Sequence, residues 1–192
     1  MSVDSASVIE ISDFIETNVM DKDFFSNFKE LDLENMKSHF SKGTIFRAPD
    51  SKIKTDLSSD TWIQFPEYPF KYLKFGFPFP NFITQFFKST NMSYGQASPM
   101  LWRILYVLNI IMADKKLELK VPDLSIVYTL TTFGSGFYIL KVKDKNKRLI
   151  GEVTQNDDHW KNRFFFVKRE SLPVGSYLPS SWVAGGKIIR YL

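Results

Sequence analysis

The chain of 192 residues contains no cysteine and only two histidines. Without thiols it has neither disulfides nor a cysteine-based zinc site, which fits a reducing intracellular compartment, nuclear or cytoplasmic. The histidines, His39 and His159, are far apart in the chain, and neither stands in a metal-ligand pattern. We therefore expect no metal and no other cofactor.

Long apolar runs are also missing. The longest extends from Ile104 to Ala113 and is interrupted by Asn109, so it is far shorter than the ~20 residues that cross a bilayer. The first residues lack the basic and apolar regions of a signal peptide. We predict a buried helix at 104–113 and no membrane association.

Catalytic motifs are equally scarce. No serine stands in a Gly-x-Ser-x-Gly setting, and Gly134-Ser135-Gly136 does not continue into a phosphate-binding loop. Asp157-Asp158-His159 is the one cluster of potential ligands. A solvated turn is the favoured interpretation, because adjacent residues of an extended chain point in different directions. An enzyme acting through these three residues is a third hypothesis, behind two non-enzymatic ones.

Aromatic side chains, by contrast, are abundant. They make up 16% of the residues, with 19 phenylalanines, and apolar residues reach 44%. Phenylalanine buries much area and has no polar group, so most of these rings are expected in a core. The length suffices for one domain with a sizeable core, or for one domain plus an arm.

Charge is distributed unevenly. Residues 1–60 hold 12 acidic and 7 basic residues, whereas residues 61–192 hold 9 acidic and 18 basic ones. We predict an acidic helical arm and linker at 1–60, with the loop at 42–61 as its boundary, and a basic, aromatic-rich domain at 61–192. Either surface charge simply varies along the chain, or the basic body binds an anionic partner and the acidic arm competes with that partner for the same surface.

Periodicity and capping residues predict several helices. Asp13 and Glu16 have capping-box spacing. Phe24, Phe25 and Phe28 share a helical face. Asp32 can cap a turn that carries Leu33, Met36 and Phe40. Four prolines favour an extended path from Phe65 to Phe79. Further helices are expected from 80 or 81 to 87, with Phe82, Ile83, Phe86 and Phe87 inward, from Pro99 to Ala113 behind an N-cap at Ser98, and from Asp123 through Leu130.

The later part of the chain is strand-like. Residues 136–142 and 149–153 predict a hairpin with a basic tip, and residues 163–168 predict a third strand. The expected fold is α+β, with helices packed on a small antiparallel sheet that extends from Gly136 to Val167.

Cations accompany the aromatic residues of this part. Stacking rings and flanking cations are the chemistry that binds single-stranded nucleic acid, although a buried strand with cations beside it is the favoured interpretation of 163–169. Trp102 and Trp160 are likewise expected to anchor the core more often than to clamp a ligand. The candidate contacts for a nucleic acid or another partner are Lys143, Lys145, Lys147, Arg148, Lys161, Arg163, Lys168 and Arg169.

Several blocks between Trp62 and Trp182 resemble the gypsy-type transposon domain of plants. They are Phe77–Ile83, Tyr94 with Gln96, Ser98–Leu105, Gly136–Tyr138 and the most specific one, Trp160–Val167 with its aromatic residues Trp160, Phe164, Phe165 and Phe166; Trp102 belongs to the Ser98–Leu105 block. The resemblance implies a retroelement-derived origin and brings no catalytic residue. Capsid-like proteins of such elements bind RNA and self-associate, but this chain lacks the cysteines of a zinc knuckle.

Two hypotheses lead. The first is a non-enzymatic, retroelement-derived interaction module that binds a protein partner or self-associates. The second is a weak, sequence-nonspecific RNA- or DNA-binding domain that uses the cations named above.

Overall fold

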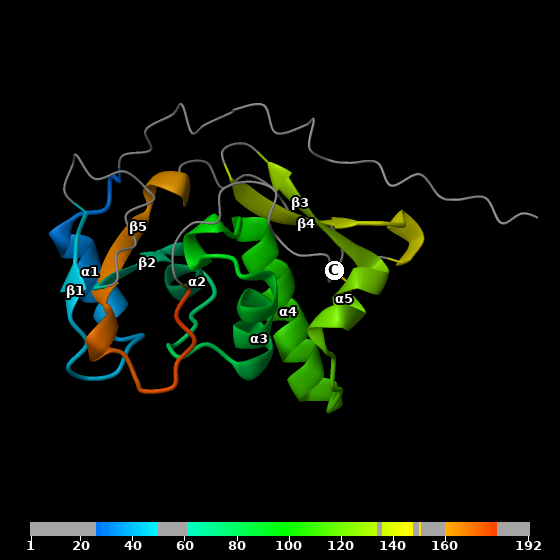
Figure 1. The fold of residues 1–192 in the computed structure, drawn as a ribbon, viewed down its shortest axis with the longest axis horizontal. Helices are drawn as coiled ribbons and strands as arrows, with labels where there is room; N and C mark the ends of the chain where they lie inside the picture. The colour runs from blue at the N-terminus through cyan, green and yellow to red at the C-terminus, as the bar shows by residue number, and fades with distance from the viewer. Residues whose placement is uncertain (1–25, 50–60, 134–135, 148–149, 151–159, 180–192) are drawn as a thin grey trace, which may run out of the picture.

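The computed structural model describes residues 26–49, 61–133, 136–147, 150 and 160–179. They form an α+β fold (Figure 1). Its helices are α1 (Glu30–Lys37), α2 (Tyr68–Lys71), α3 (Asn81–Thr90), α4 (Pro99–Lys115) and α5 (Val121–Val127). Its strands are β1 (Phe46–Arg47), β2 (Trp62–Pro66), β3 (Tyr128–Phe133), β4 (Phe137–Val142) and β5 (Phe164–Lys168).

The two central helices follow the sequence pattern closely. In α3 the predicted residues Phe82, Ile83, Phe86 and Phe87 are all buried. In α4 the Ser98 hydroxyl accepts a hydrogen bond from the Leu101 N–H at 3.2 Å, and Pro99 occupies the first turn. Both predicted starts are confirmed. At α4 a side-chain acceptor and a residue without an N–H suit the unpaired donors of the first turn.

The three-stranded sheet has the order β1-β5-β2, and both pairs are antiparallel. The central strand β5 is therefore the last in the sequence, and its neighbours come from residues 46–47 and 62–66. Phe165 lies opposite Phe65, and Phe166 lies opposite both Gln64 and Arg47. The predicted strand at 163–168 is confirmed, but it does not belong to the same sheet as β4.

The hairpin consists of β3 and β4, paired in register from Tyr128 with Val142 to Phe133 with Phe137. The sequence did not predict β3 as a partner of β4. The predicted strand at 149–153 stays a prediction, because all of that segment but Ile150 lies outside the described residues. The predicted helix through Leu130 is wrong. It ends at Val127, because Tyr128-Thr129-Leu130-Thr131 alternates large and β-branched residues that suit a strand.

Two N-terminal predictions also need correction. Residues 65–79 are not extended throughout, since α2 forms with Pro69 in its first turn, where a missing N–H costs nothing. Asp32 does not precede its helix but lies inside the first turn of α1, where its carboxylate accepts from the Lys29 N–H at 2.8 Å.

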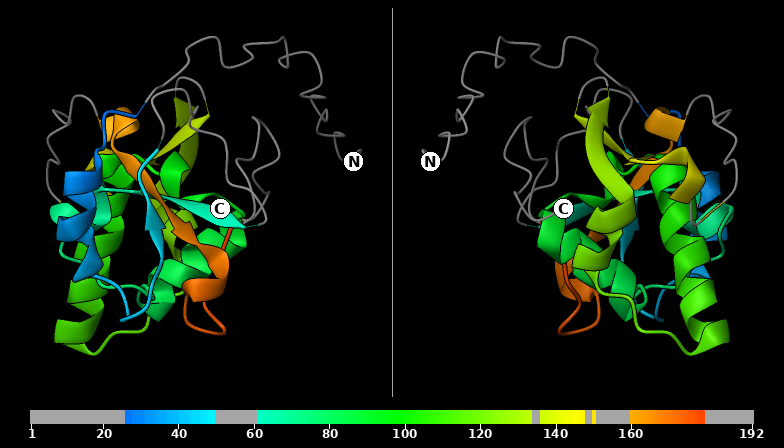
Figure 2. Two further views of the ribbon diagram at one scale, coloured as in Figure 1. Left: turned by 90° about the vertical axis from the view of Figure 1, so that its left-hand side faces the viewer. Right: turned by 90° about the vertical axis from the view of Figure 1, so that its right-hand side faces the viewer.

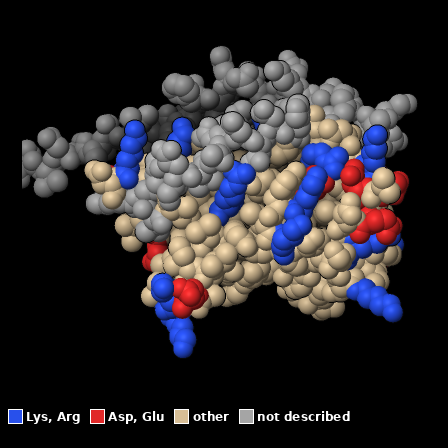
Figure 3. Space-filling view, turned by 180° about the vertical axis from the view of Figure 1, so that it is seen from behind, with Lys and Arg blue, Asp and Glu red and all other residues tan. Residues whose placement is uncertain are grey.

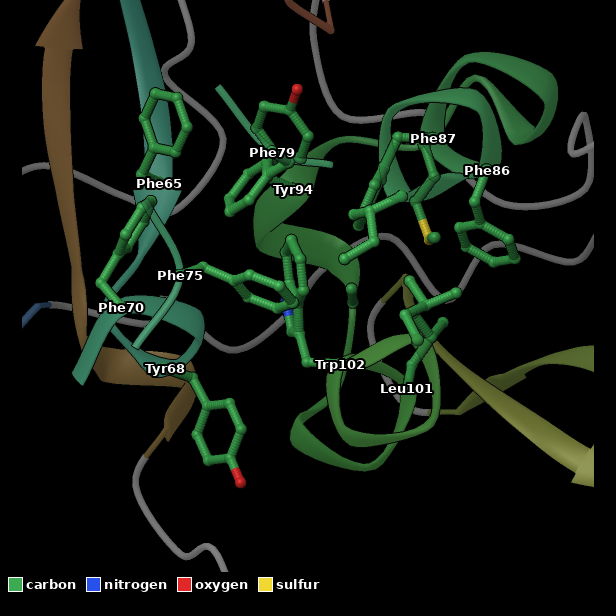
Figure 4. Close-up of a cluster of buried hydrophobic side chains, with 14 of the residues drawn as sticks. Phe65, Tyr68, Phe70, Phe75, Phe79, Phe86, Phe87, Tyr94, Leu101 and Trp102 are labelled. Atoms are coloured by element: carbon green, nitrogen blue, oxygen red, sulfur yellow. The ribbon is translucent and has the colours of Figure 1, made fainter. Parts of the chain in front are cut away.

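Figures 1 and 2 show α4 between the β1-β5-β2 sheet on one side and the β3-β4 hairpin with α5 on the other. Trp102 of α4 is fully buried and packs against Phe75, Phe79 and Phe87 (Figure 4). Within the described part of the chain, no helix is both long and apolar enough to cross a membrane.

Residues 26–49 share this core. Phe28, Leu33 and Met36 are buried with the rings of the body, and β1 completes the sheet. Residues 26–49 of the predicted arm and linker thus pack on the body, because their apolar face needs the body as its partner. The predicted helix around Asp13–Glu16 and the residues Phe24 and Phe25 lie outside the described residues.

Candidate interaction surface

The aromatic block of β5 is core on both faces. Phe164, Phe165 and Phe166 are 2%, 0% and 0% exposed. Phe165 stacks on Phe28 and Phe65, with ring centroids 5.4 and 6.0 Å away. On the opposite face Phe164 and Phe166 meet edge to face. These rings cannot stack on bases, so the interpretation of the block as a buried strand is confirmed.

The two tryptophans next to cations have different settings. Trp102 is 0% exposed and anchors the core. Trp160 is half-buried in a single turn before β5 and packs edge-on against Phe137 at 4.7 Å. The ammonium of Lys161 also lies over the Phe137 ring, 5.0 Å from its centroid. Lys161 thus packs on Phe137, the first residue of β4.

Arg163 is held by carboxylates inside the molecule. Its guanidinium donates to both oxygens of Glu67, from Nε at 2.8 Å and from Nη2 at 2.6 Å, and pairs with Asp32 at 3.1 Å. It also donates to the Asn27 carbonyl and lies over the Phe28 ring. This group, here called the Arg163 cluster, joins the segment before α1 to β2 and β5.

Charges within the cluster shift each other's titration. The hydrogen bonds to Glu67 raise the pKa of Arg163 against the effect of its burial. Burial raises the pKa of Asp32, but the Lys29 N–H and Arg163 outweigh it and keep that pKa below the ordinary value of 3.8. Burial lowers the pKa of Lys71, yet Glu67 reverses the direction. Arg163, Lys71 and Asp32 therefore keep their charges at neutral pH.

Accessible cations lie in the last part of β4 and just after it. The side chains of Lys141, Lys143 and Lys145 are exposed, and Lys143 donates to the Ser125 carbonyl at the end of α5. Lys147 continues the same turn, and Arg148 lies outside the described residues. The structure thus gathers three lysines at this end of the hairpin, here called the hairpin lysines.

Two further predicted cations, Lys168 and Arg169, close β5. The ammonium of Lys168 pairs with Glu170, and the Arg169 N–H donates to the Thr61 carbonyl at 2.8 Å. Lys168 and Arg169 thus lie at the opposite end of β5 from Arg163, separated from it by the length of the strand.

A shallow, open depression was not predicted from the sequence. Phe75 and Phe77 form its floor, and its rim consists of Leu73, Lys74, Pro78, Pro80, Tyr106 and Asn109. The loop from 73 to 80 is fixed against α1 by the hydrogen bond from the Phe77 N–H to the His39 carbonyl at 2.7 Å. The signal for it was the run of alternating aromatics and prolines.

Potential metal ligands remain dispersed. Among the residues that the structure describes, no three of His, Asp and Glu come together as a metal site would require. His39 is tied to the Phe75 carbonyl through Nδ1 at 2.7 Å, and Asp157, Asp158 and His159 lie outside the described residues. Comparison of the chain with protein-family models, with curated proteins and with solved structures gives no match.

Proposed function

We propose that the chain is a non-enzymatic interaction module that binds acidic polypeptide, either on a partner protein or on a second copy of itself. The observation that carries the proposal is the separation of charge. The described residues contain 19 lysines and arginines against 9 aspartates and glutamates, a net charge of +10, although the whole chain carries only +4. A surface of one sign attracts partners of the other sign and steers their approach.

The positive charge is spread over a surface that also exposes single apolar side chains. In Figure 3 the basic side chains are spaced over one face of the molecule, and the acidic ones gather at a few places near its edges. Exposed apolar side chains accompany them, among them Tyr72, Ile110, Leu117 and Ile126. Single exposed apolar residues are normal, but on a surface with an excess of cations they favour a polypeptide partner that is both acidic and apolar.

A retroelement-derived origin is part of the proposal. The blocks Phe77–Ile83, Ser98–Leu105 and Trp160–Val167, which carry the resemblance, form the entry to α3, the beginning of α4, and β5. All three contribute rings to the aromatic core. The resemblance therefore concerns how the domain folds, and the binding residues are to be sought elsewhere on its surface.

Sedimentation velocity of the full chain tests the lead function. We expect association that rises with protein concentration at about 0.05 M salt and weakens at about 0.5 M, where charges beyond a few ångströms are screened. A chain that stays monomeric at low salt, and that also fails to bind a labelled peptide of alternating glutamate and leucine, would contradict the proposal.

The hairpin lysines favour a second candidate, weak binding to RNA or DNA through phosphates. Because the rings of β5 are buried, such binding would be electrostatic and indifferent to sequence. Fluorescence anisotropy with a single-stranded RNA should show affinity that falls steeply with salt and that is reduced in K141E/K143E/K145E. Equal reversal at Lys29, Lys37 and Lys42, which are exposed near α1, is the matched control. Salt-independent binding would exclude this candidate.

A further inference from the structure

We infer that residues 1–25 of the chain dock on the depression between the 73–80 loop and α4. The inference rests on the proposed preference for acidic polypeptide and names its first occupant as the protein's own N-terminal segment. Such an occupant would compete with partners that bind the same place.

Charge complementarity is the first argument. Residues 1–25 carry six acidic residues and one lysine. Every residue that lines the depression lies between 73 and 109, and the stretch 68–113 contains four cations and not one carboxylate. It is the longest part of the described chain without an acidic residue. Lys74 is exposed on the rim, where an aspartate or glutamate can reach it.

Apolar complementarity is the second. The depression has an aromatic floor and two prolines and a tyrosine on its rim. The segment supplies Ile9, Ile11, Phe14, Ile15 and Val19, and the capping-box spacing of Asp13 and Glu16 predicts a helix there. The N-terminal segment and the depression thus match each other both in apolar side chains and in opposite charge.

Chain length permits the contact. The segment joins the body at Ser26, whose hydroxyl donates to the carbonyls of Asn162 and Phe164. From there α1 covers about 12 Å at 1.5 Å per residue and ends beside the loop, where Phe77 bonds to His39. Twenty-five residues span about 37 Å even if wholly helical, so the segment can run back along α1 with length to spare.

The absence of cysteine makes a spin-label experiment straightforward, because one introduced thiol is unique in the full chain. A nitroxide on S12C should broaden the amide resonances of Leu73, Tyr106 and Asn109 and leave those of Asn146, beyond the hairpin, sharp. Replacing the six acidic residues of the segment with their amides, or making K74E, should abolish the broadening. The matched control K145E should retain it.

A mixed sample separates this inference from the proposed function. Isotope-labelled chain without a nitroxide is combined with unlabelled chain that carries it, so that only contacts between copies broaden the signals. If the mixed sample shows the same broadening as the chain that carries both labels, the contact lies between copies, which would support self-association and overturn docking within one chain. Uniform broadening, or none in the singly labelled chain, would overturn the docking inference while leaving the binding of acidic peptide to be measured separately.

Discussion

At the scale of single residues, the buried carboxylate of Glu67 holds the guanidinium of Arg163 inside the fold. Its side chain is 4% exposed, and a buried carboxylate needs a cation and hydrogen bonds to remain ionised. Arg163 supplies both through two parallel bonds, and Lys71 adds a third contact at 3.3 Å. The guanidinium is therefore committed to the fold and has little left for a phosphate.

Arg163→Met should lower the free energy of unfolding by about 3 kcal/mol, because it leaves Glu67 buried with Lys71 as its remaining partner. Urea denaturation measures the loss. In R163M/E67Q the buried charge is gone, so part of the stability should return. K168M removes a cation whose partner is 71% exposed and should change stability by less than about 0.5 kcal/mol. Equal effects of R163M and K168M would contradict the role of the cluster.

Asp32→Asn should alter how stability depends on pH. The folded protein holds the pKa of Asp32 below its ordinary value, so the stabilising contribution is complete above that value of 3.8 and is lost as pH falls through the lower, folded-state pKa. At neutral pH we expect D32N to be about 1 kcal/mol less stable than the wild type. Denaturation across a pH series should show this difference shrinking below pH 3.8, and a constant difference would contradict the assignment.

At the scale of elements, local sequence determined the helices better than the strands. Ser98 and Pro99 mark the start of α4 because a cap acts within four residues. The partners of β4 and β5 follow no local rule. β5 pairs with β2, about a hundred residues earlier. β4 pairs with β3, which was predicted in part as the end of a helix that begins at Asp123. Strand pairing depends on tertiary contacts that a single sequence does not display.

The same limit applies to the candidate site. Arg163 was grouped with the phosphate contacts because it is a cation beside phenylalanines, and its true partner stands 96 positions away. Glu67 inside the apolar run from Trp62 to Phe70 was the available signal, since a charge there requires a partner. Lys143 and Lys145 were predicted because lysines that crowd a short polar stretch remain in water whatever the fold, whereas Lys141 lies in β4 and was not among the predicted contacts.

Ser98→Ala should lower the free energy of unfolding by about 1 kcal/mol, because the Leu101 N–H loses its acceptor in a buried setting. Thermal or urea denaturation provides the measurement. Ser38→Ala, at the exposed C-terminal end of α1, is the matched control and should be close to neutral. A neutral S98A would show that water or another group satisfies that donor.

At the scale of the whole molecule, most of the buried aromatic rings belong to one connected core. Phe165 of the sheet contacts Phe28 and Phe40. Phe65 of the same sheet stacks on Tyr94, which in turn contacts Trp102 of α4. Such pairs add about 0.5–1.5 kcal/mol each beyond the area they bury. The segment before α1, the sheet and α4 should therefore unfold together.

Phe165→Ala tests this connection. Removing a fully buried phenylalanine costs about 3–5 kcal/mol, through lost burial and the cavity left behind. Native-state hydrogen exchange should show loss of protection both in β2 and in α4, because the two share the core. Loss confined to the sheet would show that α4 and the hairpin form an independent unit.

The position of β5 in the sheet has a consequence for biosynthesis. A ribosome releases β1 and β2 long before β5, and neither strand touches the other, because β5 lies between them. Until residue 168 has left the exit tunnel, β1 and β2 cannot pair with β5. Over the same period Phe28, Phe40 and Phe65 lack their contacts with Phe165. The sheet of this protein is consequently assembled after translation of nearly the entire described chain.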